Sequence, residues 1–276
     1  MIKNIKIVSY ILGFILIIVI LWFTNGFLGN PISKTLANNV AQKYIKNNYS
    51  NLDVNISRVY YSFKDGYYYV DLKSPTSKDT HFTVSISPFG KIEYDSYDEM
   101  VLKKYNTYTR IDELYNLKVK KVFEDENFLY KTDIYFGEVK IMSLENEDSE
   151  FGPIYGIDIS KLELDKDYDI NEIGKKYGHI VLYIEDKDIS LERTSDILID
   201  VKSILDEKNI SFYVIDFTLQ EHKQNEQDDS KTISIQQFLY DDIYKKDLNE
   251  RLEKACNELQ NYYDEQDKIK RELENN

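Results

Sequence analysis

An unbroken apolar run near the N-terminus is followed by a long series of amphipathic segments. Residues 7–23 contain no charge, and Ser9 is their main polar interruption. A run of this length is at the short end of what crosses a bilayer, and Ile5 extends it if Lys6 reaches back to the headgroups. The pattern therefore predicts one membrane span over about residues 5–23.

The charges beside this run predict its orientation. Lys3 and Lys6 precede it, so the positive-inside rule places the N-terminus in the cytoplasm and residues 25–276 outside the cell membrane. A cleaved signal peptide is the alternative, but its apolar core is shorter and ends at an A-x-A-like site. Residues 24–29 offer a poor site of that kind, so an uncleaved signal anchor is the favoured interpretation.

Residues 30–96 read as a helix followed by an antiparallel sheet. Asn30 is a good N-cap and Pro31 suits the first helical position, so a helix runs from there to near Asn48. Its apolar stripe either packs on the following sheet, which we favour, or lies on anionic lipid or wall polymer. Alternating segments predict four strands at residues 52–57, 67–72, 82–86 and 91–94, with turns at 64–66 and 88–90.

Tyrosines lie on both sides of the second of these strands. Tyr67 and Tyr69 project from one side, and Tyr68 projects from the other. They form either an exposed recognition surface or cross-strand pairs that stabilise the hairpin, and the second interpretation is favoured.

A helical linker over residues 97–127 precedes an α/β module at residues 128–240. Asp169, with Glu172 as its capping-box partner, and Ser190 are the expected helix caps in this module. A strand, a helix and a strand follow one another within about 40 residues, so the module should contain a parallel βαβ unit. Strands are predicted at residues 132–142, 153–159, 179–184, 210–219 and 232–239.

The last segment, residues 241–276, is a charged helix with a heptad-like seam. In one interpretation, the seam joins two copies of the chain through residues 248–273. In the other, which is favoured, the first half of the helix packs on the sheet of its own chain and the tail projects. The expected fold class is α+β: a membrane helix over residues 1–29, two small modules and a long C-terminal helix. The seam positions are Leu248, Leu252, Ala255, Leu259, Tyr262, Gln266, Ile269 and Leu273.

Charge excludes one class of partner. The first 52 residues contain five lysines and no acid, so the net charge of −14 leaves −19 on residues 53–276. A domain of that sign is repelled by nucleic acid. The single cysteine, Cys256, excludes intrachain disulfides and cysteine-rich zinc sites.

No residue pattern indicates a reaction centre. The three histidines, His81, His179 and His222, have no partner at metal-ligand spacing, and Cys256 occupies a packing position in a helix. The sequence therefore predicts no catalytic, cofactor-binding or metal-binding residues.

One segment has part of a calcium-loop pattern. Asp165, Asp167, Asp169 and Asn171 alternate, but Ile170 replaces the required glycine and Lys176 the required glutamate. We expect a helix cap at Asp169 and no calcium. The acidic run at residues 145–150 is interpreted as a solvated loop.

Asn30, Pro31, Ser33 and Ala37, within the run from residue 24 to 44, resemble the start of the YfjL-like proteins of Gram-positive bacteria. The resemblance implies one N-terminal membrane segment and two small α/β modules, and it offers no active site. The helix-plus-hairpins module is also similar to PepSY-type domains, which often inhibit peptidases or serve as accessory parts of envelope proteins.

The expected function is an extracytoplasmic binding or accessory module of a Gram-positive-type cell envelope, which contacts another envelope protein or a wall polymer and is not an enzyme. The alternatives are an envelope hydrolase that uses carboxylates and a structural homo-oligomer built through residues 248–273.

Overall fold

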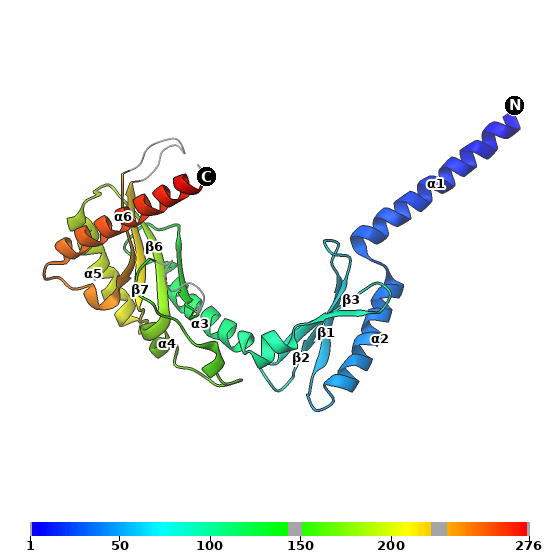
Figure 1. Cartoon of the computed structure of the whole chain (residues 1–276), viewed down its shortest axis with the longest axis horizontal. Coiled ribbons are helices and arrows are strands. Elements are labelled where there is room, and N and C mark those ends of the chain that lie inside the picture. The colour runs from blue at the N-terminus through cyan, green and yellow to red at the C-terminus, as the bar shows by residue number, and fades with distance from the viewer. Residues whose placement is uncertain (1, 143–150, 222–230, 275–276) are drawn as a thin grey trace. The chain divides into compact units, whose positions relative to one another are not determined.

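The computed structural model describes residues 2–142, 151–221 and 231–274. It contains two compact units (Figure 1), the first comprising Met1–Thr107 with Leu162–Asp165 and the second comprising Tyr108–Lys161 with Lys166–Asn276. Each unit is built on its own four-stranded sheet. The α+β fold class predicted from the sequence is confirmed.

The chain begins with α1 (Ile2–Leu28), which is long and apolar enough to cross a membrane. Its side chains from Tyr10 to Leu28 are exposed wherever they are described, as expected for a helix surrounded by lipid or for a signal sequence. Gly29 separates α1 from the next helix with φ = +68°, and a Cβ there would lie 2.7 Å from Tyr61 Cγ. Only glycine fits this conformation and this approach.

Helix α2 (Pro31–Asn48) begins as predicted, because the Asn30 side chain accepts a hydrogen bond from the Ser33 backbone N–H at 2.7 Å. Small residues on its inner face, Ala37 and Ala41, are fully buried. They let the helix approach the sheet closely (Figure 1), so the prediction that this helix packs on its own sheet is confirmed.

The first sheet is an antiparallel meander. The predicted first strand is too early, because Leu52 N–H bonds back to the Tyr49 carbonyl in a turn and pairing starts only at Asn55. Tyr60 and Tyr69 face each other as a cross-strand pair with ring centroids 5.5 Å apart, which confirms the packing interpretation for these tyrosines. The strands, in order across the sheet, are β1 (Asn55–Tyr61), β2 (Tyr68–Lys73), β3 (His81–Ile86) and β4 (Ile92–Asp95).

A distant segment completes the first unit around a buried carboxylate. Asp79 is fully buried, and its Oδ2 accepts hydrogen bonds from the Thr107 hydroxyl (2.9 Å) and the Asp165 N–H (2.8 Å). In return, the Asp79 N–H donates to Asp165 Oδ1 at 3.0 Å. The carboxylate of Asp165, the first in the calcium-like pattern, therefore already accepts a hydrogen bond from the protein.

The second unit contains the predicted parallel unit. β6 (Gly178–Asp186) pairs parallel with β7 (Val214–Glu221), and α5 (Leu191–Glu207) connects them. Asp169 and Ser190 cap α4 (Ile170–Tyr177) and α5 as predicted. The remaining strands, β5 (Tyr135–Val139) and β8 (Thr232–Leu239), pair antiparallel at the two edges.

Three strand predictions in this unit differ from the structure. The strand expected at 132–142 is limited to β5, and the one expected at 210–219 starts at Val214. Residues 153–159 form no strand, only a single bridge between Ile157 and Ile141. Pro153, which has no N–H for a ladder, explains part of this difference.

One edge of this sheet is covered by α3 (Tyr105–Phe123), which follows a short π-helical turn at Asp98–Leu102. Three polar side chains spaced by four residues bond the outer backbone of β5. The Val139 N–H donates to Asp112 Oδ1 at 2.7 Å, the Tyr108 hydroxyl donates to the Val139 carbonyl, and Asn116 accepts from the Gly137 N–H. The helix therefore supplies hydrogen-bond partners to backbone groups on the outer edge of β5.

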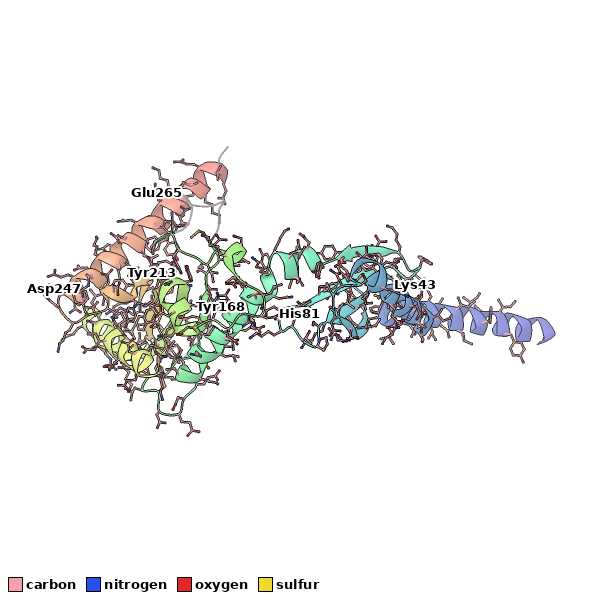
Figure 2. The ribbon with its side chains drawn as sticks, turned by 90° about the horizontal axis from the view of Figure 1, so that it is seen from below. Lys43, His81, Tyr168, Tyr213, Asp247 and Glu265 are labelled. Atoms are coloured by element: carbon pink, nitrogen blue, oxygen red, sulfur yellow. The ribbon has the colours of Figure 1, made fainter. Side chains whose placement is uncertain are left out.

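The C-terminal helix α6 (Leu248–Glu274) starts later than the predicted residue 241, because a 3-10 turn and Asp247 at φ = +54° precede it. Leu248, Leu252 and Leu259 are buried against the unit, whereas residues 264–274 are exposed. Figure 2 marks Asp247 just before the helix and Glu265 in this tail. The favoured prediction, in which the first half packs and the tail projects, is confirmed.

Candidate functional site

A histidine lies between two carboxylates on one face of the second sheet. Glu138 is the cross-strand partner of His179, so their side chains share one face. Asp216 pairs with Val181, two residues further along the same face of β6. His179 Nδ1 lies 2.8 Å from Glu138 Oε1, and its Nε2 lies 3.1 Å from Asp216 Oδ1 without the alignment of a hydrogen bond.

This arrangement favours a charged imidazole. Burial of His179 lowers its pKa, but the contacts with Asp216 and Glu138 outweigh burial, and the net pKa is raised. The contact with His179 lowers the pKa of Glu138 against the opposing effect of burial. The His179 side chain is 6% exposed, while Glu138 and Asp216 are 39% and 23% exposed. The carboxylates therefore face water and neutralise the buried ring.

The chemistry open to this cluster is restricted by its own contacts. Both ring nitrogens face carboxylate oxygens, and Asp216 Oδ1 also accepts the Gln237 N–H at 2.7 Å. A base or metal ligand needs a free ring nitrogen, which these contacts remove. Within the described ranges, no group of three or more metal-binding side chains is arranged around a common centre. The cluster links β5, β6 and β7 electrostatically.

Sequence reasoning missed this cluster because its members are far apart in the chain. Glu138, His179 and Asp216 become neighbours only through strand pairing, which motif spacing does not reveal. The available signal was His179 at the start of a nearly continuous apolar strand, since a buried histidine needs polar partners.

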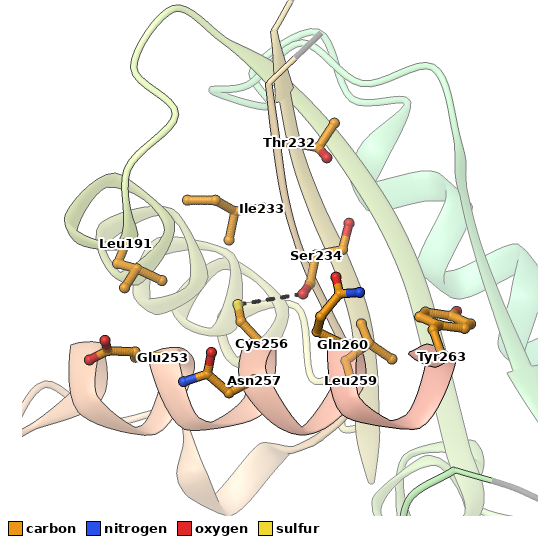
Figure 3. Close-up of a pocket in the computed structure, with 10 residues that line it drawn as sticks. All are labelled: Leu191, Thr232, Ile233, Ser234, Glu253, Cys256, Asn257, Leu259, Gln260 and Tyr263. Carbon is orange, nitrogen blue, oxygen red and sulfur yellow. Dashed lines mark hydrogen bonds between the residues drawn. The ribbon is translucent and has the colours of Figure 1, made fainter. Parts of the chain in front are cut away.

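Of the other sequence candidates, the structure describes His81 and Cys256. His81 is exposed at the start of β3, while His222 and the acidic run at 145–150 lie outside the described residues. Cys256 points from α6 toward β8 and lines a pocket of about 420 Å³ (Figure 3). Its Sγ lies 3.5 Å from the Ser234 carbonyl oxygen, and burial raises the pKa of the thiol. A half-buried thiol with a raised pKa suits the packing role that the sequence indicated.

An N-terminal apolar helix followed by two α+β units, each with a four-stranded sheet, defines the structural class of this protein. Residues 4–96 match the YfjL-like, N-terminal domain, and residues 114–253 match the YfjL-like C-terminal domain. The chain therefore belongs to the YfjL-like family, and the resemblance seen at Asn30–Ala37 is confirmed. No curated protein and no solved structure matches it.

Proposed function

We propose that this chain is a single-pass membrane protein whose two units lie outside the cell membrane and act as a binding or accessory module of a Gram-positive-type cell envelope. The observation that carries the proposal is α1, an apolar, exposed helix at the N-terminus of two α+β units. Lys3 and Lys6 on its N-terminal side support an orientation with the units outside.

Contacts between α1 and the first sheet support an uncleaved anchor. The Tyr61 hydroxyl donates to the Gly26 carbonyl at 3.0 Å, and the Asn30 N–H donates to the Tyr68 hydroxyl oxygen at 2.7 Å. The rings of Phe27 and Phe63 lie 6.0 Å apart. A cleavage near residues 24–29 would remove part of this packed junction, so the helix is better explained as part of the mature protein.

A binding role is also favoured over the alternative of an envelope hydrolase. Hydrolases that use carboxylates need an acid and a base held free for substrate. In the part of the chain that the structure describes, Glu138 and Asp216 both contact His179, so the proposal assigns them a structural role.

Cysteine labelling of intact cells tests the topology. In a Cys256→Ser background, Lys268→Cys lies in the exposed tail of α6, and Lys3→Cys precedes the span. A membrane-impermeant maleimide should label Lys268→Cys in intact cells and label Lys3→Cys only after lysis. The reverse pattern would overturn the proposal, and a mature mass that lacks residues 1–29 would replace the anchor with a signal peptide.

In-cell crosslinking of the tagged full-length protein tests the accessory role. We expect one envelope protein or wall polymer to be recovered reproducibly in the crosslinked fraction. If only the uncrosslinked chain is recovered at several crosslinker lengths, the accessory role is wrong and the hydrolase alternative gains weight.

A further inference from the structure

Two of the three hairpin turns of the first sheet lie at the same end of it. Tyr68, which starts β2, pairs with Ile86, which ends β3, so the turn at residues 62–67 and the turn at 87–91 project in the same direction. The Tyr68 hydroxyl reaches the backbone of Asn30, where α1 gives way to α2. The tips therefore lie at the end of the unit from which α1 emerges.

Large apolar side chains are exposed at this end. Phe63 and Phe89, at the two turns, are 61% and 92% exposed, and Ile32, in the first turn of α2, is 83% exposed. Turns usually carry small or polar residues, and side chains this exposed gain little from burial within their own unit. Lys64 and Lys91 flank the two rings in sequence, the second paired with Glu93 at 3.0 Å. We call Ile32, Phe63, Lys64, Phe89 and Lys91 the tip surface.

The depth of this surface relative to the span decides what can cover it. Phe63 packs beside Phe27, which lies four residues, or about 6 Å of helix, beyond Phe23 at the end of the apolar run. The headgroup layer on each side of a bilayer is about 5–8 Å thick. A ring next to Phe27 therefore lies at headgroup depth when α1 spans the bilayer, where aromatic and lysine side chains are favoured.

We propose that the tip surface docks on the outer leaflet of the membrane, with the ring of Phe63 at headgroup depth beside Phe27. The inference rests on the proposed function, because it requires α1 to span the bilayer. Lys64 and Lys91 lie where anionic headgroups would meet them, while Asp65 and Glu93 keep the local charge near balance, so apolar contact supplies most of the binding. The first unit is then held against the membrane at α1 and at the tips.

Lipid quenching in nanodiscs tests this contact with the full-length chain. In a Cys256→Ser background, Lys64→Cys carries an environment-sensitive fluorophore beside the intact Phe63, and Lys73→Cys, exposed at the far end of β2, is the matched control. Nanodiscs contain phosphatidylcholine and phosphatidylglycerol, with or without a lipid carrying a shallow doxyl group. We expect quenching at residue 64 to exceed that at residue 73 by at least about twofold, with a blue-shifted emission.

Two further measurements make each outcome decisive. Phe63→Ser with Phe89→Ser changes only exposed side chains, so the unit should keep its melting temperature while the difference between the two positions disappears. Equal quenching at both positions in the intact protein would overturn the docking contact. Carbonate extraction reports separately on α1: a chain released from the membrane contradicts the proposed anchor itself, whereas a retained chain with equal quenching contradicts only the docking.

Discussion

At the scale of single residues, His179 shows how a buried polar group is accommodated. Its ring lies in a sheet of apolar strands, where an unpaired charge would be costly. Glu138 and Asp216, on the neighbouring strands, supply compensating charge from the partly solvated face. Lys140, 4.0 Å from Glu138, and the nearby carboxylate of Asp112 complete its electrostatic surroundings.

This cluster predicts a pH-dependent stability. Because the pKa of His179 is raised in the folded state, its contribution is fully present below about pH 6.5 and is lost as pH rises through the folded value. Glu138, whose pKa is lowered, contributes above about pH 4.5 and loses its contribution in more acidic solution. The cluster therefore stabilises the fold most between these two values.

His179→Gln should remove the part of the pH dependence of stability that lies near neutral pH. We expect the variant to lose about 1–2 kcal/mol at pH 6, after allowance for solvent screening, and less at pH 8.5. Thermal melts across this range measure the difference, with His81→Gln as the control because His81 is exposed on the other sheet. Parallel pH profiles for His179→Gln and the unaltered protein would mean that folding leaves the pKa of His179 unchanged, and would contradict the prediction.

At the scale of elements, α3 packs on the second sheet and also hydrogen-bonds the backbone of its edge strand, β5. Tyr115 and Val119 bury one face of the helix against Gly137, where a Cβ would lie 2.6 Å from Val119 Cγ2. Tyr108, Asp112 and Asn116 lie on the adjacent face and bond the backbone of β5. The sequence predicted only a helical linker over residues 97–127, and the bonds of its polar side chains to β5 are visible only in the structure.

Asp112→Ala tests this edge contact. Removing the carboxylate leaves the Val139 N–H without its 2.7 Å acceptor, so we expect a loss of about 1–2 kcal/mol in the free energy of unfolding. Glu113→Ala is the matched control, since it removes the same charge from the exposed neighbouring position. Denaturant titration measures both variants, and equal small effects would mean that water replaces the carboxylate at no cost.

At the scale of the whole molecule, the heptad-like seam is largely used within one chain. Leu248, Leu252 and Leu259 are buried in the second unit, which leaves Ile269 and Leu273 as the exposed aliphatic seam positions. Coiled coils usually need three or four heptads of apolar seam. We therefore predict a monomer rather than an oligomer built through residues 248–273.

Light scattering of the detergent-purified chain tests this preference. The protein mass, corrected for detergent, should stay that of one 32.7 kDa chain as concentration rises. Ile269→Asp with Leu273→Asp should leave it unchanged. A mass that grows with concentration and returns to one chain in the double variant would establish the oligomer alternative.

The sequence by itself determined the features that depend on local periodicity and end signals. The apolar run of α1, the Asn30-Pro31 start of α2 and the caps at Asp169 and Ser190 were predictable, because their causes lie within a few neighbouring residues. The parallel βαβ unit was predictable from the order of a strand, a helix and a strand within about 40 residues. Family membership followed from the same local pattern around residues 30–37 and is confirmed over both units.

Only the tertiary structure decided which distant residues meet. The Asp79–Asp165 contact joins positions 86 residues apart, and Glu138, His179 and Asp216 come together through strand register. Strand limits at Asn55 and Val214 also depended on pairing, because an alternating segment becomes a strand only where a partner satisfies its backbone. Contacts between remote segments are set by packing and hydrogen bonding of the whole unit, which no local pattern encodes.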